Sequence, residues 1–559
     1  MKFKEVSIKN FRNFKDIKIN ISNKNIFFGL NDIGKTNFMY ALRYMFDKNI
    51  RKNGFLEFDF HKKNVETPIE ITVVIDISDT DNPDSQKLRA RLKGDILSQH
   101  SNVFIRLVAK YNVQELIAMP IMYWGGDLDR LYEIKQRGYR YDIDYIFNVI
   151  YIDSYVDLYN LFKKNIGVLI KTDNVSDDET LKDIQTAVDQ LNANISKLSG
   201  VKEFEEKITP KYQKFRSEKV SISIKSEIAM KGLYSNIVPY IKQTDDENLY
   251  PTAGEGRKKL LVYSIYDLLS AENGDLMINL FLIEEPENHL HKSLQIALSK
   301  IIFASDKYNY LFVTTHSPFI LYDMDDVSLI RIFHGSAIDS ASYFYQVPLN
   351  FGKSCKMLNK YLAEAIFANK VLLVEGPSEV LLFEKILSTI NPFYEADGIY
   401  ILSVGGVGFS KYCKILNALK IKLVIKTDND FKRPRGEKKY ATYGFDRCNN
   451  IIGKNVLEIK TYEQNSVANK RRLYQKNKAV LDNIRIEYGI FLSKVDLEND
   501  LDEILHDKLC TYLSTPNPVK YLQKSKRFHM ADLVKEIQDD DCKVIFEHYN
   551  FACLEEIIK

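Results

Sequence analysis

Acidic residues stand directly after two apolar segments of this chain, where they could bind a metal ion. The segment Leu280–Ile283 is followed by Glu284 and Glu285, and another predicted strand is followed by Asp428 and Asp430. Open α/β sheets bind their ligands at the carboxyl ends of their strands. Carboxylates are the oxygen ligands that hard divalent cations prefer, and a bound cation can activate water. The pattern therefore indicates metal-assisted hydrolysis, and a core strand running into an acidic turn is the structural alternative.

A phosphate-binding loop is predicted near the start of the chain. Residues 25–28 form an apolar strand, and the pattern G-x4-G-K-T follows over Gly29–Thr36 before a helical pattern. The glycines let backbone N–H groups and the helix N-terminus face phosphates. In that context the lysine reaches the β- and γ-phosphates and the threonine holds Mg²⁺. The residues predicted to bind the nucleotide here are Asn31, Gly34, Lys35, Thr36 and Asn37.

Two later segments could complete a nucleotide site. Gly254 and Gly256, with cations beside them, precede a predicted helix over residues 260–269, which suits an anion. An apolar strand over residues 310–315 then delivers His316 to its carboxyl end. Each feature has a structural alternative, because glycines often make ordinary turns and a lone histidine is usually structural. Their order after the phosphate loop favours the functional interpretation.

These four segments occur in the order found in ABC-type ATPases, and Glu-Glu-Pro-Glu-Asn-His-Leu-His resembles the branch that contains RecF, SMC and OLD-family proteins. The resemblance implies that Glu284 takes the metal-side acidic role, that Glu285 polarises the attacking water and that His316 senses the γ-phosphate. It also implies that Gly254 and Gly256 belong to a signature that completes the ATP site of a second protomer, and hence a dimer. This signature lacks a serine and Glu284 replaces the commoner aspartate, so we expect slow hydrolysis.

The second half of the chain carries another α/β pattern. A strand over residues 371–374 ends in Glu375, and Glu379 begins a predicted helix, where one turn brings it near Glu375. The strand before Asp428 and Asp430 can run parallel to the first, which would gather these four acids at one edge. Clustered carboxylates repel one another unless cations lie among them. The pattern therefore indicates a divalent metal site.

The four acids of this second pattern resemble those of the TOPRIM domain of topoisomerases, primases and OLD-family nucleases. An ABC-type ATPase followed by TOPRIM in one chain resembles specifically the OLD (overcoming lysogenization defect) family. That resemblance implies a two-metal nuclease with Glu375, Glu379, Asp428 and Asp430, a further acid and a lysine. The best matches for the further acid are Asp496 and Glu498, and the best match for the lysine is Lys526. Lys524 is an alternative lysine, and Glu498 could instead belong to an ordinary acidic helix start.

The predicted fold is α/β in two parts. An ABC-type ATPase head is expected over residues 1–355, and a Rossmann-like TOPRIM domain over residues 366–559. Between about residues 160 and 235, three- and four-residue apolar spacings from Leu181 to Leu198 predict helices. An apolar stripe of this kind needs a partner surface, so we expect an inserted helical arm that mediates dimerisation.

Composition restricts the partners and the location. The net charge is +3, so bulk charge does not indicate nucleic-acid binding. Two local basic runs, residues 431–439 and 470–478, stand near the second acid group and could hold DNA phosphates without reading sequence, although such runs are often solvated surface. Six scattered cysteines form no CxxC pair, and no apolar run is long enough for a leader or a membrane span. A cytoplasmic protein without membrane contact is expected.

The expected function is an ATP-binding and ATP-hydrolysing, divalent-metal-dependent DNA endonuclease that nicks or cuts both strands. Its expected cofactors are ATP and Mg²⁺, and Mn²⁺ or Ca²⁺ could serve at the TOPRIM site. The family resemblance implies bacterial defence against phage, a homodimer or larger homo-oligomer, and a partner that is helicase-like or a reverse transcriptase with its RNA–DNA product. Two alternatives remain: topoisomerase-like or primase-like TOPRIM chemistry, and an ATP-gated DNA clamp or sensor with an inert TOPRIM domain.

Overall fold

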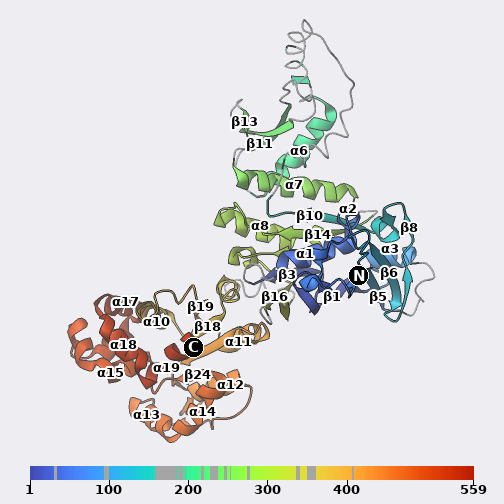
Figure 1. The fold of residues 1–559 in the computed structure, drawn as a ribbon. Coiled ribbons are helices and arrows are strands. Elements are labelled where there is room, and N and C mark those ends of the chain that lie inside the picture. Colours follow the sequence, from blue (N-terminus) through green and yellow to red (C-terminus); the bar gives the residue numbers. More distant parts are fainter. Residues whose placement is uncertain are drawn as a thin grey trace. The chain divides into compact units, whose positions relative to one another are not determined.

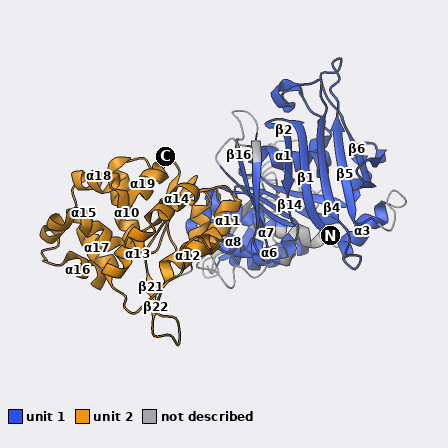
Figure 2. Cartoon of the chain, turned by 90° about the horizontal axis from the view of Figure 1, so that it is seen from below, with its two compact units in different colours: residues 1–356 blue, residues 357–559 orange. Residues whose placement is uncertain are grey.

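The computed structural model divides the chain into two compact units, residues 1–356 and 357–559, which Figure 2 colours separately. The predicted nucleotide-site residue Asn31 and most of the predicted helical arm lie outside the described residues. The structure describes residues 1–29, 34–92, 100–155, 197–215, 220–226, 237–243, 249–251, 254–273, 277–334, 340–348, 360–405 and 408–559, with a few isolated positions between 156 and 196.

The first unit begins with an antiparallel sheet in the strand order β2-β1-β4-β5-β6-β7. In β1, Val6 and Ile8 are fully buried whereas Lys4 and Lys9 are exposed, the alternation of a strand with one covered face. The buried face belongs to an apolar cluster that includes Phe38 of α1. The strands are β1 (Lys2–Phe11), β2 (Phe14–Asn20), β4 (Ile69–Asp76), β5 (Asn102–Ala109), β6 (Pro120–Asp127) and β7 (Arg130–Glu133).

A second, mostly parallel sheet has the order β10-β14-β15-β3-β16-β17, with only the β16–β17 pair antiparallel. β14 and β15 are almost continuously apolar and buried, as expected for parallel strands covered on both faces. Figure 1 shows α7 and α8 beside this sheet. The strands are β3 (Lys24–Phe28), β10 (Phe147–Ile152), β14 (Ile278–Glu284), β15 (Leu311–Thr314), β16 (Ser328–His334) and β17 (Ser340–Gln346).

Helices and a small hairpin lie between these strands along the chain. Trp124, the single tryptophan, is buried in the first sheet. The helices are α1 (Lys35–Phe46), α2 (Lys48–Arg51), η1 (Glu57–Asp59), η2 (His61–Lys63), α3 (Pro83–Arg91), η3 (Asp142–Tyr145), α7 (Glu255–Asn273), α8 (Lys292–Ala304), η4 (Asp306–Tyr308) and η5 (Pro318–Leu321), and the hairpin is β8 (Gln136–Arg137) with β9 (Arg140–Tyr141).

The predicted arm region contains strands as well as a helix. α6 (Ser199–Gln213) agrees with the predicted helical pattern and contacts α7 and β11. An antiparallel sheet of β11 (Val220–Ser226), β12 (Ile237–Gln243) and β13 (Leu249–Pro251) follows. β11 therefore falls in a stretch that the prediction made helical. The reason is the alternation of apolar and polar residues in Val-Ser-Ile-Ser-Ile-Lys-Ser, which has the period of a strand.

The second unit is a parallel sheet in the order β19-β18-β20-β24, surrounded by helices. Its strands are β18 (Lys370–Val374), β19 (Ile399–Ser403), β20 (Lys422–Thr427) and β24 (Ile490–Leu492), and a small sheet holds β21 (Phe431–Lys432), β22 (Tyr440–Thr442) and β23 (Thr461–Tyr462). Its helices are α10 (Pro377–Ile390), α11 (Phe409–Ala418), α12 (Tyr443–Ile452), α13 (Val467–Lys476), α14 (Lys478–Tyr488), α15 (Leu497–Tyr512), α16 (Pro518–Lys524), α17 (Lys526–Glu536), α18 (Asp539–Glu547), η6 (Tyr549–Phe551) and α19 (Ala552–Ile558).

An apolar core holds this second unit together around α10. Leu382, Phe383, Ile386 and Leu387 of that helix are fully buried, because they recur at three- and four-residue spacings on the face that packs inward. Burying one such side chain contributes about 1.5–3 kcal/mol. The core thereby fixes the first turn of α10, which carries Glu379. Among the helices that the structure describes, none has both the length and the apolar character needed to cross a membrane.

Candidate functional site

Parallel strand order brings the predicted nucleotide-binding segments to one edge of the second sheet. β14, β15 and β3 are neighbours, with Glu284 opposite Thr314 and Thr314 opposite Phe27. Glu284 ends β14, His316 follows β15, and the phosphate loop follows β3. All three segments therefore leave the sheet at the carboxyl ends of adjacent strands, where open α/β sheets bind ligands.

The described part of the phosphate loop leads directly into α1. Gly34 has a φ of 107°, in the region that favours glycine, and α1 begins at Lys35. The Lys35 Nζ donates to the carbonyl oxygen of the loop's first glycine at 3.0 Å, and Asn37 Nδ2 donates to Asn13 Oδ1 at 2.8 Å. The side chain of Thr36 is exposed. The loop thus holds its lysine close to its own backbone and leaves the threonine accessible.

Glu285 and His316, predicted to act on the attacking water and the γ-phosphate, face each other. His316 Nε2 lies 3.6 Å from Glu285 Oε1, and Asn288 Nδ2 donates to Glu285 Oε2 at 2.7 Å. Burial, together with the nearby charge of Lys35, lowers the pKa of His316. Glu285 has a φ of 42°, which costs energy for a residue with a side chain. The structure therefore brings the loop lysine, the histidine and this glutamate into one site.

Glu284 is a buried carboxylate whose surroundings suit a cation. Its exposed fraction is 5%, and burial followed by the charge of Asp153 raises its pKa to about 7. Among the residues that the structure describes, its Oε1 has no hydrogen-bond partner. A buried charged oxygen without a partner carries a large desolvation cost unless it is protonated or binds a cation. The residues at this edge therefore fit a divalent ion beside the phosphate loop.

Two residues that the sequence interpretation left without a role support this edge. Glu287 accepts hydrogen bonds from Thr315 Oγ1 at 2.9 Å and from His316 N at 2.6 Å, so it fixes the turn that carries the histidine. Lys259 of α7 donates from Nζ to the Glu285 carbonyl oxygen at 2.7 Å, and burial lowers its pKa to about 8. Glu287 lies in the Glu-Glu-Pro-Glu segment, whose sequence could indicate a role for it. Lys259 is one of several cations beside the signature glycines, and no sequence feature singles it out.

The predicted signature glycines stand at the start of α7. Gly254 is exposed and precedes the helix, and Gly256 lies in its first turn. A Cβ at Gly256 would lie 2.7 Å from the carbonyl oxygen of His289, in the turn after β14. Glycine is therefore required there for close packing of α7 on this turn.

The second unit gathers acids at the carboxyl ends of three neighbouring strands. Glu375 follows β18 and Glu379 lies in the first turn of α10, Asp428 and Asp430 follow β20, and Glu498 lies in the first turn of the helix after β24. Because β18, β20 and β24 are adjacent and parallel, these ends share one edge. The predicted gathering of acids from segments far apart in the chain is therefore present.

Glu379, Asp428 and Glu498 form a buried group of mutually repelling carboxylates. Their exposed fractions are 7%, 7% and 1%. Burial raises the pKa of each, and repulsion from neighbouring acids adds to this effect, whereas Lys526 opposes it at Glu379 and Glu498. Glu498 Oε2 has no hydrogen-bond partner among the described residues, whereas Oε1 lies 3.8 Å from Lys526 Nζ. Such a group fits a divalent cation, and of the two candidate lysines Lys526 is the one paired with it.

Glu375 and Asp430 are held by an arginine instead. Arg447 Nη1 donates to Glu375 Oε1 and to Thr427 Oγ1, and its Nη2 donates to Asp430 Oδ2 at 2.8 Å. Glu375 Oε1 also accepts from Thr427 Oγ1 and from Asp428 N, each at 2.7 Å. Among the described residues, no three acid, histidine or cysteine side chains lie close enough together in this conformation to hold a metal ion. The four predicted acids are thus divided, with two of them bridged by an arginine.

Asp496 has a structural contact at each carboxylate oxygen. It caps the N-terminus of α15, where Oδ1 accepts from Asn499 N at 2.9 Å and from Asn499 Nδ2 at 2.7 Å. Gln523 Nε2 donates to its Oδ2 at 2.9 Å. We call Asp428-Asn429-Asp430 the DxD segment. Of the two acids predicted after it, Glu498 therefore has the oxygen that is available to a ligand.

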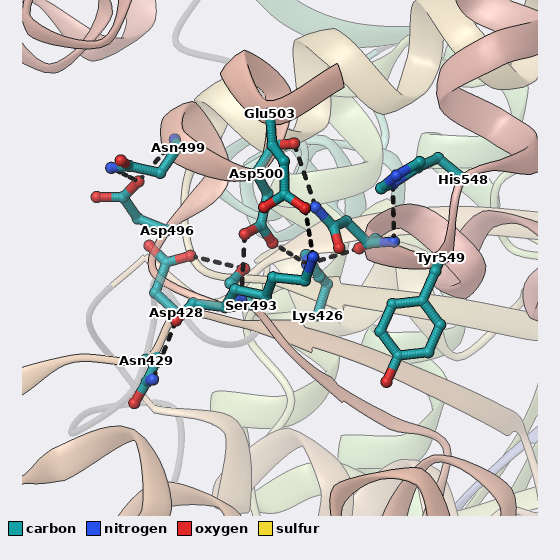
Figure 3. A network of polar contacts seen from close by, with 12 residues as sticks. Lys426, Asp428, Asn429, Ser493, Asp496, Asn499, Asp500, Glu503, His548 and Tyr549 are labelled. Carbon is teal, nitrogen blue, oxygen red and sulfur yellow. Dashed lines mark hydrogen bonds and ion pairs between the residues drawn. The ribbon is translucent and has the colours of Figure 1, made fainter. Parts of the chain in front are cut away.

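A buried polar network behind the acids fixes the strand ends (Figure 3). Lys426 Nζ of β20 lies 3.1 Å from Asp500 Oδ2 of α15, and both side chains are almost fully buried. Asp500 Oδ1 accepts from Lys494 N at 3.1 Å, and Ser493 Oγ donates to Asp428 Oδ1 at 3.3 Å. The network ties the loop after β24 to β20. It therefore sets where Asp428 stands relative to the first turn of α15.

The two predicted basic runs lie partly beside the DxD segment. Lys432 and Lys470 oppose the effect of burial on the pKa of Asp430, which is raised overall. Lys470 is buried, with its Nζ 6.0 Å from the ring centre of Phe431. Residues 432–439 are exposed, and residues 433–439 connect β21 to β22 as a hairpin. One cation of each run therefore lies close to the acids, and most of the first run is free to meet a ligand from solvent.

Comparison with known proteins decides the family. An AAA ATPase domain model matches residues 1–321, and an overcoming lysogenization defect protein-like TOPRIM domain model matches residues 366–430. The chain is 43% identical to Endonuclease GajA of Bacillus cereus strain VD045 over 573 residues, covering 100% of this chain and 99% of that protein. The chain belongs to the OLD family. This confirms the family resemblance and the predicted fold class, an ATPase followed by TOPRIM, and makes the OLD-family chain an ATPase and nuclease enzyme.

More distant similarities of this OLD-family chain are weaker. Endonuclease GajA of Bacillus cereus strain HuB5-5 is 21% identical over 56% of this chain and 50% of that protein. An Smc head domain with an extended coiled coil from Pyrococcus furiosus has a TM-score of 0.38 at 13% identity, covering 64% of this chain and 99% of that structure. The SMC head domain from Thermotoga maritima has a TM-score of 0.33 at 12% identity, covering 62% and 100%.

Proposed function

We propose that this chain is an ATP-binding and ATP-hydrolysing, divalent-metal-dependent DNA endonuclease that nicks or cuts both strands. The observation that carries the proposal is the buried group of Glu379, Asp428 and Glu498 beside Lys526. Three buried carboxylates with one lysine beside them carry more negative charge than that lysine balances, which favours a further cation among them. The name of the relative of similar length, Endonuclease GajA, supports the same reaction class.

Each residue of the proposed nuclease site has a task that its position supports. Glu379, Asp428 and Glu498 would hold the divalent ion, with Mg²⁺ the expected ion and Mn²⁺ or Ca²⁺ able to replace it. Such an ion supplies a water of lowered pKa and neutralises charge on a phosphodiester. Lys526, whose Nζ lies 3.8 Å from Glu498 Oε1, would neutralise charge that builds on the phosphorus oxygens. Lys432 would contact the DNA backbone.

The first unit is proposed to control this reaction through ATP. Lys35 and Thr36 would bind the phosphates and Mg²⁺, with Glu284 as the acid on the metal side. Glu285 would accept a proton from the attacking water. His316, whose Nε2 lies 3.6 Å from Glu285 Oε1, would contact the γ-phosphate. The signature of a second copy of the chain, Gly254 and Gly256, is proposed to complete the site, so the protein would act as a homodimer or larger oligomer.

The biological setting follows from the family. We propose a role in bacterial defence against phage, in the cytoplasm, with a partner encoded nearby that is helicase-like or a reverse transcriptase with its RNA–DNA product. The proposed division places the ATPase domain in residues 1–355, with its insertion at about 160–235, and the TOPRIM nuclease in residues 366–559.

Cleavage of supercoiled plasmid tests the proposal. Wild type with Mg²⁺ or Mn²⁺ should cut it, and Glu379→Gln should not, since the substitution removes a charged ligand. Glu384→Gln is the matched control, because it removes a carboxylate from the exposed side of the same helix. Lys35→Ala, with and without ATP, reports how nucleotide controls cleavage.

The same experiment separates the proposal from its main alternative. If wild type binds DNA but leaves it intact with every ion and with the product of the neighbouring gene, the chain is an ATP-gated clamp with an inert TOPRIM domain. Equal cleavage by wild type and Glu379→Gln would contradict the assignment of this site.

A further inference from the structure

The proposed nuclease site contains a cation that belongs to the protein itself. The Arg447 guanidinium bridges Glu375 and Asp430, which follow β18 and β20 at the same sheet edge as the buried acids. Its side chain is only 14% exposed, and it comes from α12, beyond the DxD segment. A guanidinium that bridges two carboxylates donates a charge-assisted hydrogen bond to each and balances one of their two negative charges. These two acids therefore already share one cation without a metal ion.

A cavity beside Arg447 gives its side chain a second place to go. The cavity has a volume of about 270 Å³ and is lined by Arg447 itself, Glu375, Phe409, Tyr443 and Lys432. The guanidinium carbon already lies 5.3 Å from the ring centre of Tyr443 and 6.0 Å from that of Phe409. Aromatic faces at this distance attract a guanidinium. Arg447 can thus leave the acids without losing every favourable contact.

We propose that Arg447 is a displaceable counter-cation: its guanidinium holds Glu375 and Asp430 in the ion-free protein and withdraws toward Phe409 and Tyr443 when these acids take a divalent ion. The inference rests on the proposed metal-dependent nuclease. It assigns two kinds of ion site to one sheet edge. The group around Glu379 binds an ion directly, whereas the pair around Glu375 binds one only in exchange for the arginine.

The exchange follows from charge and space. A divalent ion between Glu375 and Asp430 would stand next to the guanidinium, and two cations cannot share the same carboxylate oxygens at contact distance without strong repulsion. Arg447 therefore weakens ion binding at this pair, because two charge-assisted hydrogen bonds must be released first. Removing the guanidinium should tighten binding there by roughly tenfold.

Binding of Mn²⁺ to the full-length protein, measured by electron paramagnetic resonance of the free ion, tests this exchange. The variants are Arg447→Gln, Arg447→Lys and the control Arg433→Gln. Arg433 is a cation of the exposed hairpin, 4.7 Å from the Tyr440 ring centre, and its loss removes the same charge without releasing the acids. We expect Arg447→Gln to bind one Mn²⁺ roughly tenfold more tightly than wild type, and Arg433→Gln to change affinity by less than about threefold.

A chemical rescue provides a second readout. Arg447→Ala leaves a hole that methylguanidinium can fill, so millimolar methylguanidinium should return its Mn²⁺ affinity to that of wild type and leave Arg433→Gln unaffected. If thermal unfolding shows that Arg447→Gln and Arg447→Ala do not fold, Arg447→Lys decides. Lysine keeps the charge but reaches only one carboxylate, so Mn²⁺ should bind more tightly than to wild type.

Each result supports or overturns the inference. If the Arg447 variants bind Mn²⁺ no more tightly than Arg433→Gln, Arg447 does not compete with the ion and the inference is wrong. Weaker binding would overturn it in favour of a residue that only orients Glu375. If wild type and all variants bind no Mn²⁺, the proposed metal-dependent nuclease fails as well, and this outcome is distinct from the previous two.

Discussion

The buried ion pair between Lys426 and Asp500 should determine much of the stability of the second unit. The side chains are only 2% and 1% exposed, and Nζ lies 3.1 Å from Oδ2. Removing one partner of a buried pair leaves an uncompensated charge, which costs about 3–5 kcal/mol. Lys426→Met should therefore lower the free energy of unfolding by that amount, a large fraction of the roughly 5–15 kcal/mol that holds a domain folded.

The magnitude converts to an observable melting temperature. For a unit of the size of residues 357–559, each kcal/mol lowers Tm by about 2–4 °C, so the loss should be about 6–20 °C. Calorimetry of the full-length protein measures it, and hydrogen exchange in peptides from β20 and α15 assigns it to this unit. The control is Lys439→Met, since Lys439 pairs with Glu463 at 2.7 Å but both side chains are more than half exposed. A surface pair contributes only about 0–1 kcal/mol.

A second substitution tests the physical reason. Combining Lys426→Met with Asp500→Leu removes both charges, and an apolar pair of similar volume is often as stable as a buried ion pair. The double variant should therefore recover most of the stability that Lys426→Met loses. If Lys426→Met melts no lower than Lys439→Met, or if the double variant is as unstable as the sum of the two single variants, the uncompensated charge is not the cause.

Other outcomes follow from single features of the two sites. Burial raises the pKa of Glu284 from 4.5 to about 7, so the unbound protein should lose up to about 3 kcal/mol as the pH rises through that window; urea unfolding at pH 5 and pH 8 should show this loss in wild type but not in Glu284→Gln or with Mg²⁺ present. Gly256→Ala places a Cβ 2.7 Å from His289 O, which should cost about 1–3 kcal/mol and weaken ATP binding in isothermal titration; unchanged stability would contradict the close contact. Lys526→Met should slow plasmid cleavage about 10²–10³-fold, whereas Lys524→Met should have a much smaller effect; equal losses would contradict the pairing of Lys526 with the acids.

The edges of both parallel sheets could be predicted from the sequence because the relevant pattern is local. An apolar run followed by a polar residue marks the carboxyl end of a buried strand, and parallel packing then brings distant ends together. Glu284, His316 and Asp428 lie at the strand ends where this pattern predicts them. The phosphate loop follows the same local pattern, an apolar strand followed by glycines and a helix, and α1 begins at Lys35, directly after Gly34.

The partners of these residues could not be predicted, because their roles depend on tertiary packing. Lys426 lies within an apolar strand, and sequence alone does not distinguish a solvent-facing lysine from one buried against Asp500. Arg447 reaches the acids from a helix that follows a hairpin. It is an isolated basic residue in the sequence, whereas each of the two predicted basic runs contains several. β11 was predicted as helix although its alternation has the strand period, because the helical spacings before it were extended too far.

Both proposed ion sites rely on a buried carboxylate oxygen without a partner among the described residues, Oε1 of Glu284 and Oε2 of Glu498. Burial raises the pKa of each carboxyl, so a proton competes with an ion there over a wider pH range than at an exposed carboxyl. An ion must then replace that proton, which makes ion uptake stronger as the pH rises. Glu375 and Asp430 differ, because an ion there would displace an arginine in addition to any proton on Asp430, whose pKa burial also raises. Arginine stays charged across the accessible range, so its displacement adds no pH dependence of its own. Removing the arginine with Arg447→Gln should therefore tighten Mn²⁺ binding by a similar factor at low and at high pH.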